Sequence, residues 1–228
     1  MRPKNLKCPF TWKGRHPVIH DRVLYVPEYY DKHHEFIFPG WESPELFGRS
    51  APIEVEYCAG NGAWIADKAA AHPERNWVAV EIQFDRVRKI WSKIQNLQLT
   101  NLIVVCGEGL TFTKHYVPAN SFAAVYVNFP DPWPKEKHAK NRLLQEPFFT
   151  EIARASVKGA LATVATDHEG YARQTIEGLL ANFAWEPCFP LPHFSMDLEG
   201  YGTSYFDALW KAQGVPVHYI QFANQGAK

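Results

Sequence analysis

The sequence predicts an α/β fold built on a doubly wound, mainly parallel β-sheet with helices on both faces. Two features of the 228 residues support this prediction. From residue 51 onward, short apolar runs alternate five times with helix-like stretches, and the connections between them are short. Hydrophobic residues make up 46% of the chain and charged residues 21%, so the chain can bury a full core and is not disordered.

Five apolar runs have the length and composition of strands. A glycine-containing turn follows the first run, and Pro130 ends the fourth. The expected strands are Ile53–Tyr57, 77–81, Leu102–Cys106, 122–129 and 161–165. Residues 215–222 alternate between apolar and polar side chains, so we expect a late antiparallel strand there that closes one edge of the sheet.

Four stretches between and after these strands have helical character. Small residues fill the first, which ends before Pro73, and apolar side chains recur at helical spacing in the second. The expected helices are Ala63–Ala71, 84–97, 143–156 and 168–182. Because ligands of doubly wound sheets bind at the carboxyl ends of the parallel strands, we expect the chemistry in the loops that follow those strands.

The first 50 residues lack this alternation. Six prolines interrupt them, and Arg2, Lys4, Lys7, Lys13 and Arg15 precede most of the acids. We therefore expect an irregular, basic and aromatic N-terminal arm over residues 1–50 and one α/β domain over residues 51–228. The start of the chain is too polar for a signal peptide and no stretch approaches ~20 apolar residues, so we expect a soluble, cytoplasmic protein.

Charge and cysteine content restrict the possible partners. The chain has 24 Lys and Arg against 24 Asp and Glu, so an RNA partner would have to bind a local basic patch. The four cysteines are far apart and form no zinc-binding pattern, so no metal site is expected. Cys58 and Cys106 lie in apolar surroundings, and we expect both to be buried, reduced thiols.

The first strand-end loop has the features of a nucleoside-binding turn. Gly60 and Gly62 stand where the strand turns into a helix, which lets a ligand approach the backbone. Glu81 ends the next strand 21 residues after Gly60, where a carboxylate can accept hydrogen bonds from both ribose hydroxyls of an adenosine. The alternative interpretations are that Gly60 and Gly62 only allow the chain to turn, and that Glu81 is a solvated acid at the end of a strand.

Two cofactor classes share this layout. A nicotinamide dinucleotide needs a third glycine, but that position is Ile65, so S-adenosylmethionine fits better. S-adenosylmethionine carries a sulfonium and an ammonium group and no phosphate, so acids are expected around it. Acids stand at four strand ends, namely Glu56, Glu81, Glu108 and Asp131.

The loop after the fourth strand suits a planar base. Prolines stiffen it, Trp133 offers a stacking surface, and Asp131 can accept N–H donors. The following residues, 135–142, hold four cations and one acid and could contact phosphates. The alternative is that residues 135–142 form a basic turn that is only solvated and contacts no phosphate.

The second half of the chain contains three motifs, namely Asn-Phe-Pro-Asp-Pro-Trp-Pro-Lys at 128–135, Ala-Thr-Asp at 165–167, and Thr-x-Tyr at 203–205. Together they resemble the bacterial tRNA (guanine(46)-N7)-methyltransferase family. The resemblance covers about residues 53–220. It implies a class I, Rossmann-like methyltransferase domain with a seven-stranded sheet, which transfers a methyl group from S-adenosylmethionine to N7 of guanine 46 in the variable loop of tRNA. It further implies a monomer or homodimer with no membrane association and no obligatory protein partner.

The resemblance also implies roles for individual residues. Cofactor binding is assigned to Glu56, Gly60, Gly62, Glu81, Glu108 and Asp131. Asp131 also takes the place of the family's catalytic residue. Substrate binding is assigned to Lys135, Asp167, Thr203, Ser204, Tyr205 and Phe206. RNA contact is assigned to Lys137, His138, Ala139, Lys140, Asn141 and Arg142.

The chain departs from the family pattern at four places, which are Cys58 for a glycine, Glu136 and Asn141 for cations, and Phe206 for a glutamate. Asp207 is not expected to replace that glutamate, because neighbouring side chains of an extended segment point in opposite directions. Three alternatives stay open: a methyltransferase for another RNA, a protein or a small molecule; a nicotinamide-dependent oxidoreductase; and a catalytically weak RNA-binding member of the family.

Overall fold

The computed structural model describes residues 1–133 and 135–226, which divide into two compact units. Unit 1 is Met1–Val117 and unit 2 is Pro118–Lys228. Pro134, which belongs to the predicted stiff loop, lies outside the described residues, and so does the side chain of Glu136. None of the described helices is both long enough and apolar enough to cross a membrane.

Unit 1 contains a mostly parallel sheet. Its strands, in spatial order, are β1 (Val18–His20), β2 (Val23–Tyr25), β5 (Leu102–Cys106), β4 (Asn76–Glu81) and β3 (Ile53–Tyr57). Strand β1 is antiparallel to β2, and the other neighbouring pairs are parallel. The register pairs Glu81 with Cys106, so the loops after β4 and β5 start at the same edge of the sheet.

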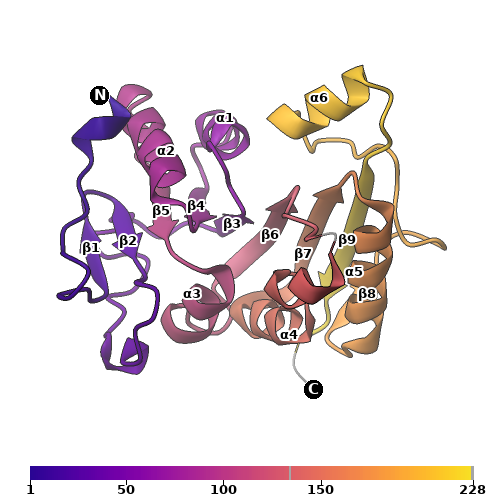
Figure 1. Cartoon of the computed structure of the whole chain (residues 1–228), viewed down its shortest axis with the longest axis horizontal. Helices are drawn as coiled ribbons and strands as arrows, with labels where there is room; N and C mark the ends of the chain where they lie inside the picture. Colours follow the sequence, from indigo (N-terminus) through magenta and orange to yellow (C-terminus); the bar gives the residue numbers. More distant parts are fainter. Residues whose placement is uncertain (134, 227–228) are drawn as a thin grey trace. The chain divides into compact units, whose positions relative to one another are not determined.

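Helices cover both faces of the unit 1 sheet. They are α1 (Ala63–Ala71), α2 (Phe84–Asn96) and α3 (Gly109–Tyr116). Figure 1 shows α1 and α2 on one face and α3 on the other. The predicted helical spacing of α2 is confirmed, because Val87, Ile90 and Ile94 are all buried. Burial of each such side chain contributes about 1.5–3 kcal/mol.

Unit 2 contains a mixed sheet. Its strands, in spatial order, are β6 (Phe122–Asn128), β7 (Ser156–Thr166), β9 (His218–Asn224) and β8 (Trp185–Pro187). Strands β6 and β7 are parallel, whereas β9 is antiparallel to both of its neighbours. The predicted late antiparallel strand is therefore confirmed.

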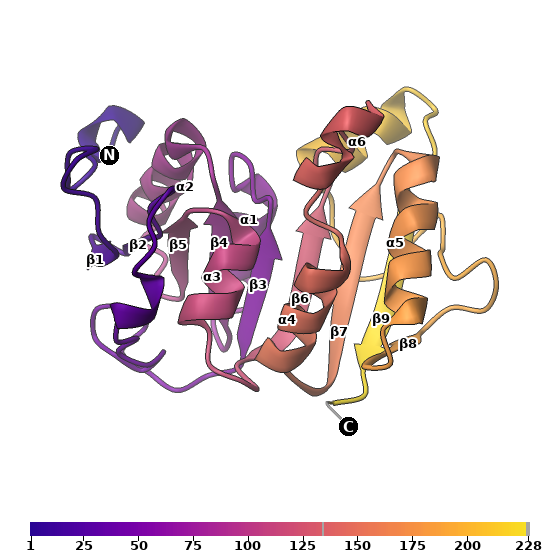
Figure 2. The same ribbon diagram turned by 60° about the horizontal axis from the view of Figure 1, so that its bottom comes forward.

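Three α-helices accompany this sheet, namely α4 (Glu146–Ala155), α5 (Glu169–Ala181) and α6 (Tyr205–Ala212). Figure 2 shows α4 and α5 side by side on one face of the sheet. The α6 helix lies beyond the carboxyl ends of β6 and β7 (Figure 1). The indole N–H of Trp185 donates to the carbonyl of Phe149 at 3.0 Å and so ties β8 to α4.

The predicted strands and helices are confirmed, with shifted ends, but the predicted strand count of seven is too low. The described residues contain nine strands, because β1 and β2 form in the arm that we expected to be irregular. Each has three residues, too few for a periodic pattern, and β2 gains its partner only in the folded chain through hydrogen bonds to β5. Strand β8 and helices α3 and α6 were also not among the predicted elements.

Candidate active site

The glycine loop of unit 1 turns sharply between β3 and α1. Cys58, Gly60 and Gly62 have φ angles of 58°, 56° and 65°, in the left-handed region. A Cβ atom on Gly62 would lie 2.6 Å from Cγ1 of Ile90. Gly62 therefore allows the start of α1 to pack against α2, which a larger residue would prevent.

Glu81, at the end of β4, holds this loop in place. Its Oε2 atom accepts the backbone N–H of Gly60 at 2.9 Å, and its Oε1 atom accepts that of Gln83 at 2.8 Å. The residue is only 4% exposed. Carboxylate oxygens have about four lone-pair sites in total, so Glu81 keeps acceptor capacity for ribose hydroxyls. Its place at the strand end is confirmed, and the ribose contact stays a prediction.

Glu108 has a structural role that the sequence analysis did not foresee. Its two carboxylate oxygens accept the backbone N–H groups of Leu110 at 2.9 Å and Thr111 at 2.6 Å, so Glu108 caps the N-terminus of α3. This cap explains why a helix forms in a stretch that begins with glycine.

Glu108 also lines a cavity of about 360 Å³, within the size range of small-molecule sites. The other lining residues are Val26, Pro27, Glu28, Tyr29, Tyr30, His33, Ile82, Thr111 and His115. Six of them belong to the first 50 residues, which the sequence analysis treated as an irregular arm. Burial and the neighbouring His115 lower the pKa of His33, which favours the neutral form of this histidine at the cavity wall.

Three predicted cofactor acids converge on Cys58. Burial raises the pKa of its thiol to about 12, and the negative charges of Glu81, Glu56 and Glu108 add to that shift. The three carboxylates therefore act on one point next to the glycine loop, where they suit a cationic ligand. The fourth predicted acid, Asp131, belongs to unit 2. Cys58 and Cys106 are free thiols, as predicted, but both are partly exposed and not fully buried. Their raised pKa makes them poor nucleophiles.

The loop after β6 in unit 2 holds two bulky residues in an unusual conformation. Phe129 and Trp133 have φ angles of 48° and 40°. The Oδ1 atom of Asp131 accepts the backbone N–H of Trp133 at 3.0 Å, and Asp131 itself is exposed. Strained backbone of this kind persists where the surrounding structure enforces it, and it clusters at functional sites.

Arg142 enforces this conformation. Its guanidinium donates to the carbonyls of Pro132 at 2.7 Å and Trp133 at 3.2 Å, and to the side chain of Gln174. It also lies over the ring of Tyr171, 5.3 Å from the centroid. Arg142 was predicted to contact RNA, and the structure shows it half-buried with these donors directed at the loop.

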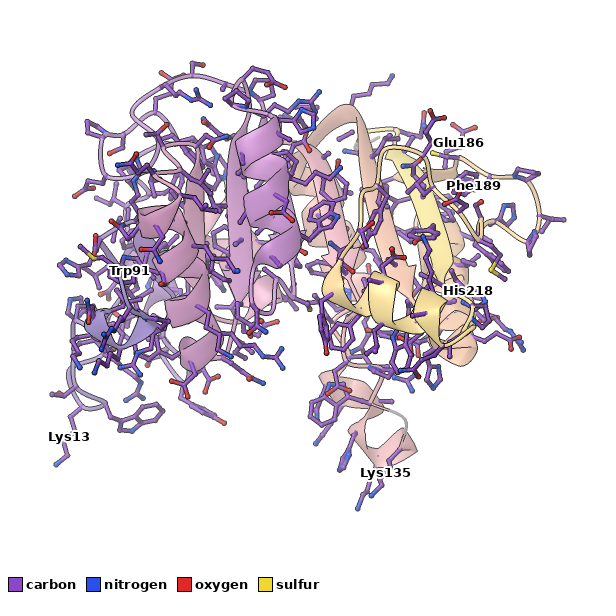
Figure 3. The ribbon with its side chains drawn as sticks, turned by 90° about the horizontal axis from the view of Figure 1, so that it is seen from above. Lys13, Trp91, Lys135, Glu186, Phe189 and His218 are labelled. Atoms are coloured by element: carbon purple, nitrogen blue, oxygen red, sulfur yellow. The ribbon has the colours of Figure 1, made fainter. Side chains whose placement is uncertain are left out.

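The rest of the predicted RNA segment lies on a 3₁₀ helix, Glu136–Asn141. Figure 3 shows the preceding Lys135 on a loop that projects from the body of unit 2. Lys137, Lys140 and Asn141 are exposed, and the ring of His138 meets that of Trp133 edge-on at 5.7 Å. Ala139 belongs to the same turn. The contact of the exposed Lys137 and Lys140 with phosphates stays a prediction.

The predicted substrate segment lies against the Asp131 loop. The hydroxyl of Tyr201 donates to Oδ1 of Asn128 at 2.8 Å, and the ring of Phe206 lies 5.8 Å from that of Phe129. Thr203 and Tyr205 are exposed, and so available to a ligand. Tyr201 was not among the predicted site residues, because its only signal in the sequence is that it is an aromatic residue just before the Thr-x-Tyr motif.

Two further predicted substrate residues also lie in unit 2. Asp167 is partly buried between β7 and α5, beside the Asp131 loop, because the N–H of Phe129 donates to the carbonyl of Ala165 at 2.8 Å. Ser204 is buried, and its Oγ atom accepts the backbone N–H of Asp207 at 3.1 Å, so it caps α6.

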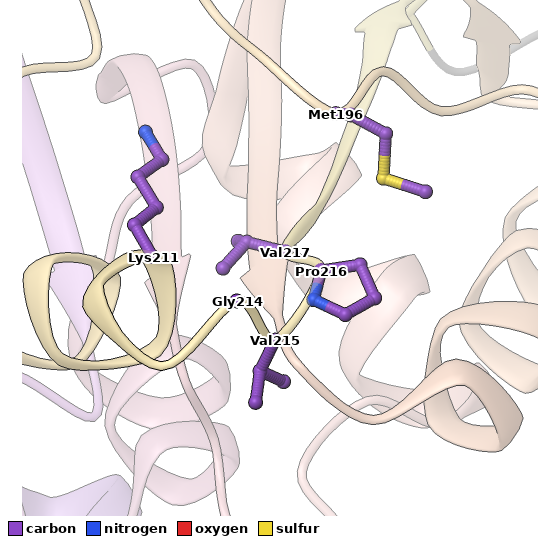
Figure 4. Close-up of a pocket in the computed structure, with 6 residues that line it drawn as sticks. All are labelled: Met196, Lys211, Gly214, Val215, Pro216 and Val217. Atoms are coloured by element: carbon purple, nitrogen blue, oxygen red, sulfur yellow. The ribbon is translucent and has the colours of Figure 1, made fainter.

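Asp207 requires a correction. The segment was expected to be extended, but it is the first turn of α6, because Ser204 caps a helix there. The Asp207 side chain is buried, accepts the hydroxyl of Tyr219, and lies 3.2 Å from Nζ of Lys211. Its carboxylate does not replace the family's glutamate, because it anchors α6 to β9. Lys211 also lines a shallow surface pocket with Met196 and Gly214 to Val217 (Figure 4).

No group of three or more His, Cys, Asp or Glu side chains in the described part of the chain could hold a metal ion. Three features of unit 1 can contact a ligand: the glycine loop, the carboxylate cluster of Glu56, Glu81 and Glu108, and the cavity beside Glu108. In unit 2 the corresponding features are the Asp131 loop and the exposed residues of the 203–206 segment.

Known proteins share this architecture. A crystal structure of a 16S rRNA (adenine(1408)-N(1))-methyltransferase from Catenulisporales acidiphilia matches with a TM-score of 0.53 at 18% identity, covering 78% of this chain and 90% of that one. The 16S rRNA methyltransferase KamB matches with a TM-score of 0.52 at 16% identity and the same coverage. These likenesses show that the chain has the Rossmann-like α/β fold of methyltransferases.

Sequence comparisons agree and are more specific. A family model described as "Putative methyltransferase" matches residues 50–192. The tRNA (guanine-N(7)-)-methyltransferase of Chlamydia caviae is 43% identical over 225 residues, which cover 99% of each chain. The protein of the same name from Syntrophotalea carbinolica is 31% identical and covers 77% of this chain and 75% of its own. The chain therefore belongs to the tRNA (guanine-N(7)-)-methyltransferase family.

Proposed function

We propose that this protein transfers the methyl group of S-adenosylmethionine to N7 of a guanine in tRNA. The observation that carries the proposal is the convergence of Glu56, Glu81 and Glu108 beside the glycine loop, in a chain with full-length relatives that bear this activity in their names. Guanine 46 of the variable loop is the proposed position, and the cytoplasm the proposed place of action.

The residues of unit 1 suit the cofactor. Glu81 has lone pairs left for the two ribose hydroxyls, and the carboxylate cluster suits a sulfonium and an ammonium group. S-adenosylmethionine supplies an electrophilic methyl group when bound. A dinucleotide fits less well, because Ile65, a fully buried residue in the first turn of α1, occupies the place of the third glycine.

The residues of unit 2 suit the acceptor. Guanine N7 carries a free lone pair and loses no proton on methylation, so the reaction needs alignment more than a general base. We assign to Asp131 the orientation of the guanine through its N–H donors and the offset of positive charge that develops on the purine. Trp133 offers its ring to the base, and the exposed Lys137 and Lys140 offer their ammonium groups to phosphates.

Incubation with labelled S-adenosylmethionine and bulk tRNA, followed by nucleoside analysis, tests the proposal. The expected product is 7-methylguanosine, and sequencing of the modified tRNA then checks position 46. Methylation of another nucleoside would show that guanine N7 is not the acceptor. Binding of tRNA without any turnover would instead support the catalytically weak alternative.

A further inference from the structure

Unit 1 exposes two large aromatic side chains next to each other. Trp12 is 62% exposed and Tyr29 is 83% exposed. Their ring centroids lie 6.1 Å apart, with the rings inclined at 63°. Side chains of this size contribute most to stability when they are buried. Their joint exposure at one place therefore indicates a role other than packing.

Arg15 holds the two aromatic residues in place. Its guanidinium donates to the carbonyls of Trp12 at 2.8 Å, Glu28 at 2.9 Å and Tyr29 at 2.6 Å. It also lies over the ring of Trp12, 4.3 Å from the centroid. Three hydrogen bonds from one side chain thus join two segments of the arm. We call Trp12, Arg15 and Tyr29 the aromatic platform.

The backbone of the aromatic platform is also specialised. Tyr29 has a φ angle of 51°, which bulky residues rarely adopt. The hydrogen bond from Arg15 to the Tyr29 carbonyl helps to maintain it. This backbone conformation costs stability and leaves the tyrosine ring exposed, which is typical of a functional site.

Charge indicates the kind of partner. Residues 1–20 contain five Lys and Arg and no Asp or Glu, although the whole chain has no net charge. Lys13 stands between Trp12 and Arg15 in the sequence, and Figure 3 shows its side chain extending outward from unit 1. Exposed aromatic rings beside a local excess of cations are the combination that binds single-stranded nucleic acid, through base stacking and phosphate contacts.

The aromatic platform adjoins the cavity beside Glu108. Tyr29 lines that cavity together with Ile82 and Glu108, the residues that follow β4 and β5. A ligand on the platform would therefore lie next to the part of unit 1 to which we assign the cofactor.

We propose that Trp12 and Tyr29 form a stacking surface for an unpaired base of the tRNA, with Lys13 contacting a neighbouring phosphate. This proposal rests on the proposed function, because it takes tRNA as the substrate. The positive charge of residues 1–20, which include Trp12, Lys13 and Arg15, favours a polyanion over a protein partner or a second copy of this chain. The stacking is sequence-tolerant, since every base has a π-face.

Binding of tRNA to Trp12→Ala and Tyr29→Ala tests the proposal. Each variant is expected to bind tRNA roughly 5-fold to 150-fold more weakly, the range found for loss of one base–aromatic stack. The slope of log affinity against log salt should stay unchanged, since no phosphate contact is lost. Lys13→Ala should instead flatten that slope by about 0.7 to 0.9. Trp12→Phe keeps a ring and should bind with intermediate affinity.

The matched control is Phe183→Ala, which removes an aromatic side chain that is 88% exposed in unit 2 and should leave affinity unchanged. Thermal unfolding and the S-adenosylmethionine-induced shift in Tm confirm that each variant folds. Wild-type affinity in both Trp12→Ala and Tyr29→Ala, in a protein that methylates tRNA, would overturn the platform and leave the proposed function standing. Failure of the wild-type protein to bind tRNA would overturn both proposals, whereas binding without methylation would overturn the proposed function alone. A changed sedimentation coefficient with unchanged tRNA affinity would assign the platform to a protein contact instead.

Discussion

The carboxylate of Glu81 accepts the backbone N–H of Gly60 at 2.9 Å and so links the end of β4 to the glycine loop after β3. Its other oxygen accepts the N–H of Gln83, just before α2. One buried side chain therefore organises two neighbouring strand-end loops. In the proposed function the same carboxylate accepts the ribose hydroxyls, so its removal affects both the loops and the ligand.

Glu81→Ala is expected to lose most of the rise in Tm that S-adenosylmethionine causes, because the ribose acceptor is gone. The free energy of unfolding should also fall by about 1–3 kcal/mol, because two backbone donors lose their partner. Thermal shift with and without cofactor measures both effects. Asp67→Ala, at an exposed position of α1, is the control and should behave like the wild-type protein. A wild-type cofactor shift in Glu81→Ala would remove Glu81 from the site.

Asp131→Asn is expected to fold normally and to lose methyl transfer by roughly 100-fold, the size of effect found when one electrostatic contact to a transition state is removed. An asparagine Oδ1 atom can still accept the N–H of Trp133, so the loop conformation is kept while the charge is lost. Single-turnover kinetics measure the rate of methyl transfer, and circular dichroism checks that the variant folds. Turnover at the wild-type rate would exclude a role for the charge.

The cations of residues 137–142 are expected to separate into two classes. Replacement of both Lys137 and Lys140 by alanine should flatten the slope of log affinity against log salt by about 1.4 to 1.8 and weaken all tRNAs alike. Arg142→Ala should lower turnover with little change in that slope, because the Arg142 guanidinium holds the carbonyls of Pro132 and Trp133. Salt titrations of tRNA binding measure the difference. A slope change from Arg142→Ala as large as that of one lysine would place Arg142 among the phosphate contacts.

Cys58→Gly is expected to be about 1 kcal/mol more stable than Cys58→Ala, because only glycine adopts a φ angle of 58° without steric cost. The comparison with alanine removes the effect of losing the sulfur atom. Urea unfolding of the two variants measures the difference in the free energy of unfolding. Equal stabilities would show that the loop relaxes around a side chain at this position.

Stability is expected to fall as the pH rises from 9 to 12. The pKa of the Cys58 thiol is raised from 9.0 to about 12 by burial and by nearby carboxylates, so in this range the unfolded chain loses a proton that the folded chain keeps. The pKa of Tyr219, raised from 10.0 to about 12, acts in the same direction. Urea unfolding at several pH values should show a shallower decline for Cys58→Ala than for the wild-type protein. Parallel curves would show that the thiol does not contribute.

Much of this protein could be predicted from local sequence. The strands Ile53–Tyr57 and Leu102–Cys106 and the helix Ala63–Ala71 end at the expected residues, because continuous apolar runs, small residues and proline stops act over a few neighbouring positions. The strand-end acids of unit 1 were found in the same way. A residue that follows a predicted parallel strand lies at a known edge of the sheet, so Glu81 and Glu108 could be placed before their contacts were known.

Other features are decided only by the tertiary structure. Strands β1 and β2 are too short to leave a periodic pattern, and β2 forms because β5 offers it hydrogen bonds. Arg142 and Lys140 have similar charge in the sequence, but packing of the loop against Arg142 makes one a support and leaves the other exposed. The same holds for Arg15, whose three carbonyl partners include residues 28 and 29. Contacts between residues so distant in the sequence depend on how the chain packs, and the spacing of residue types along the chain carries no record of them.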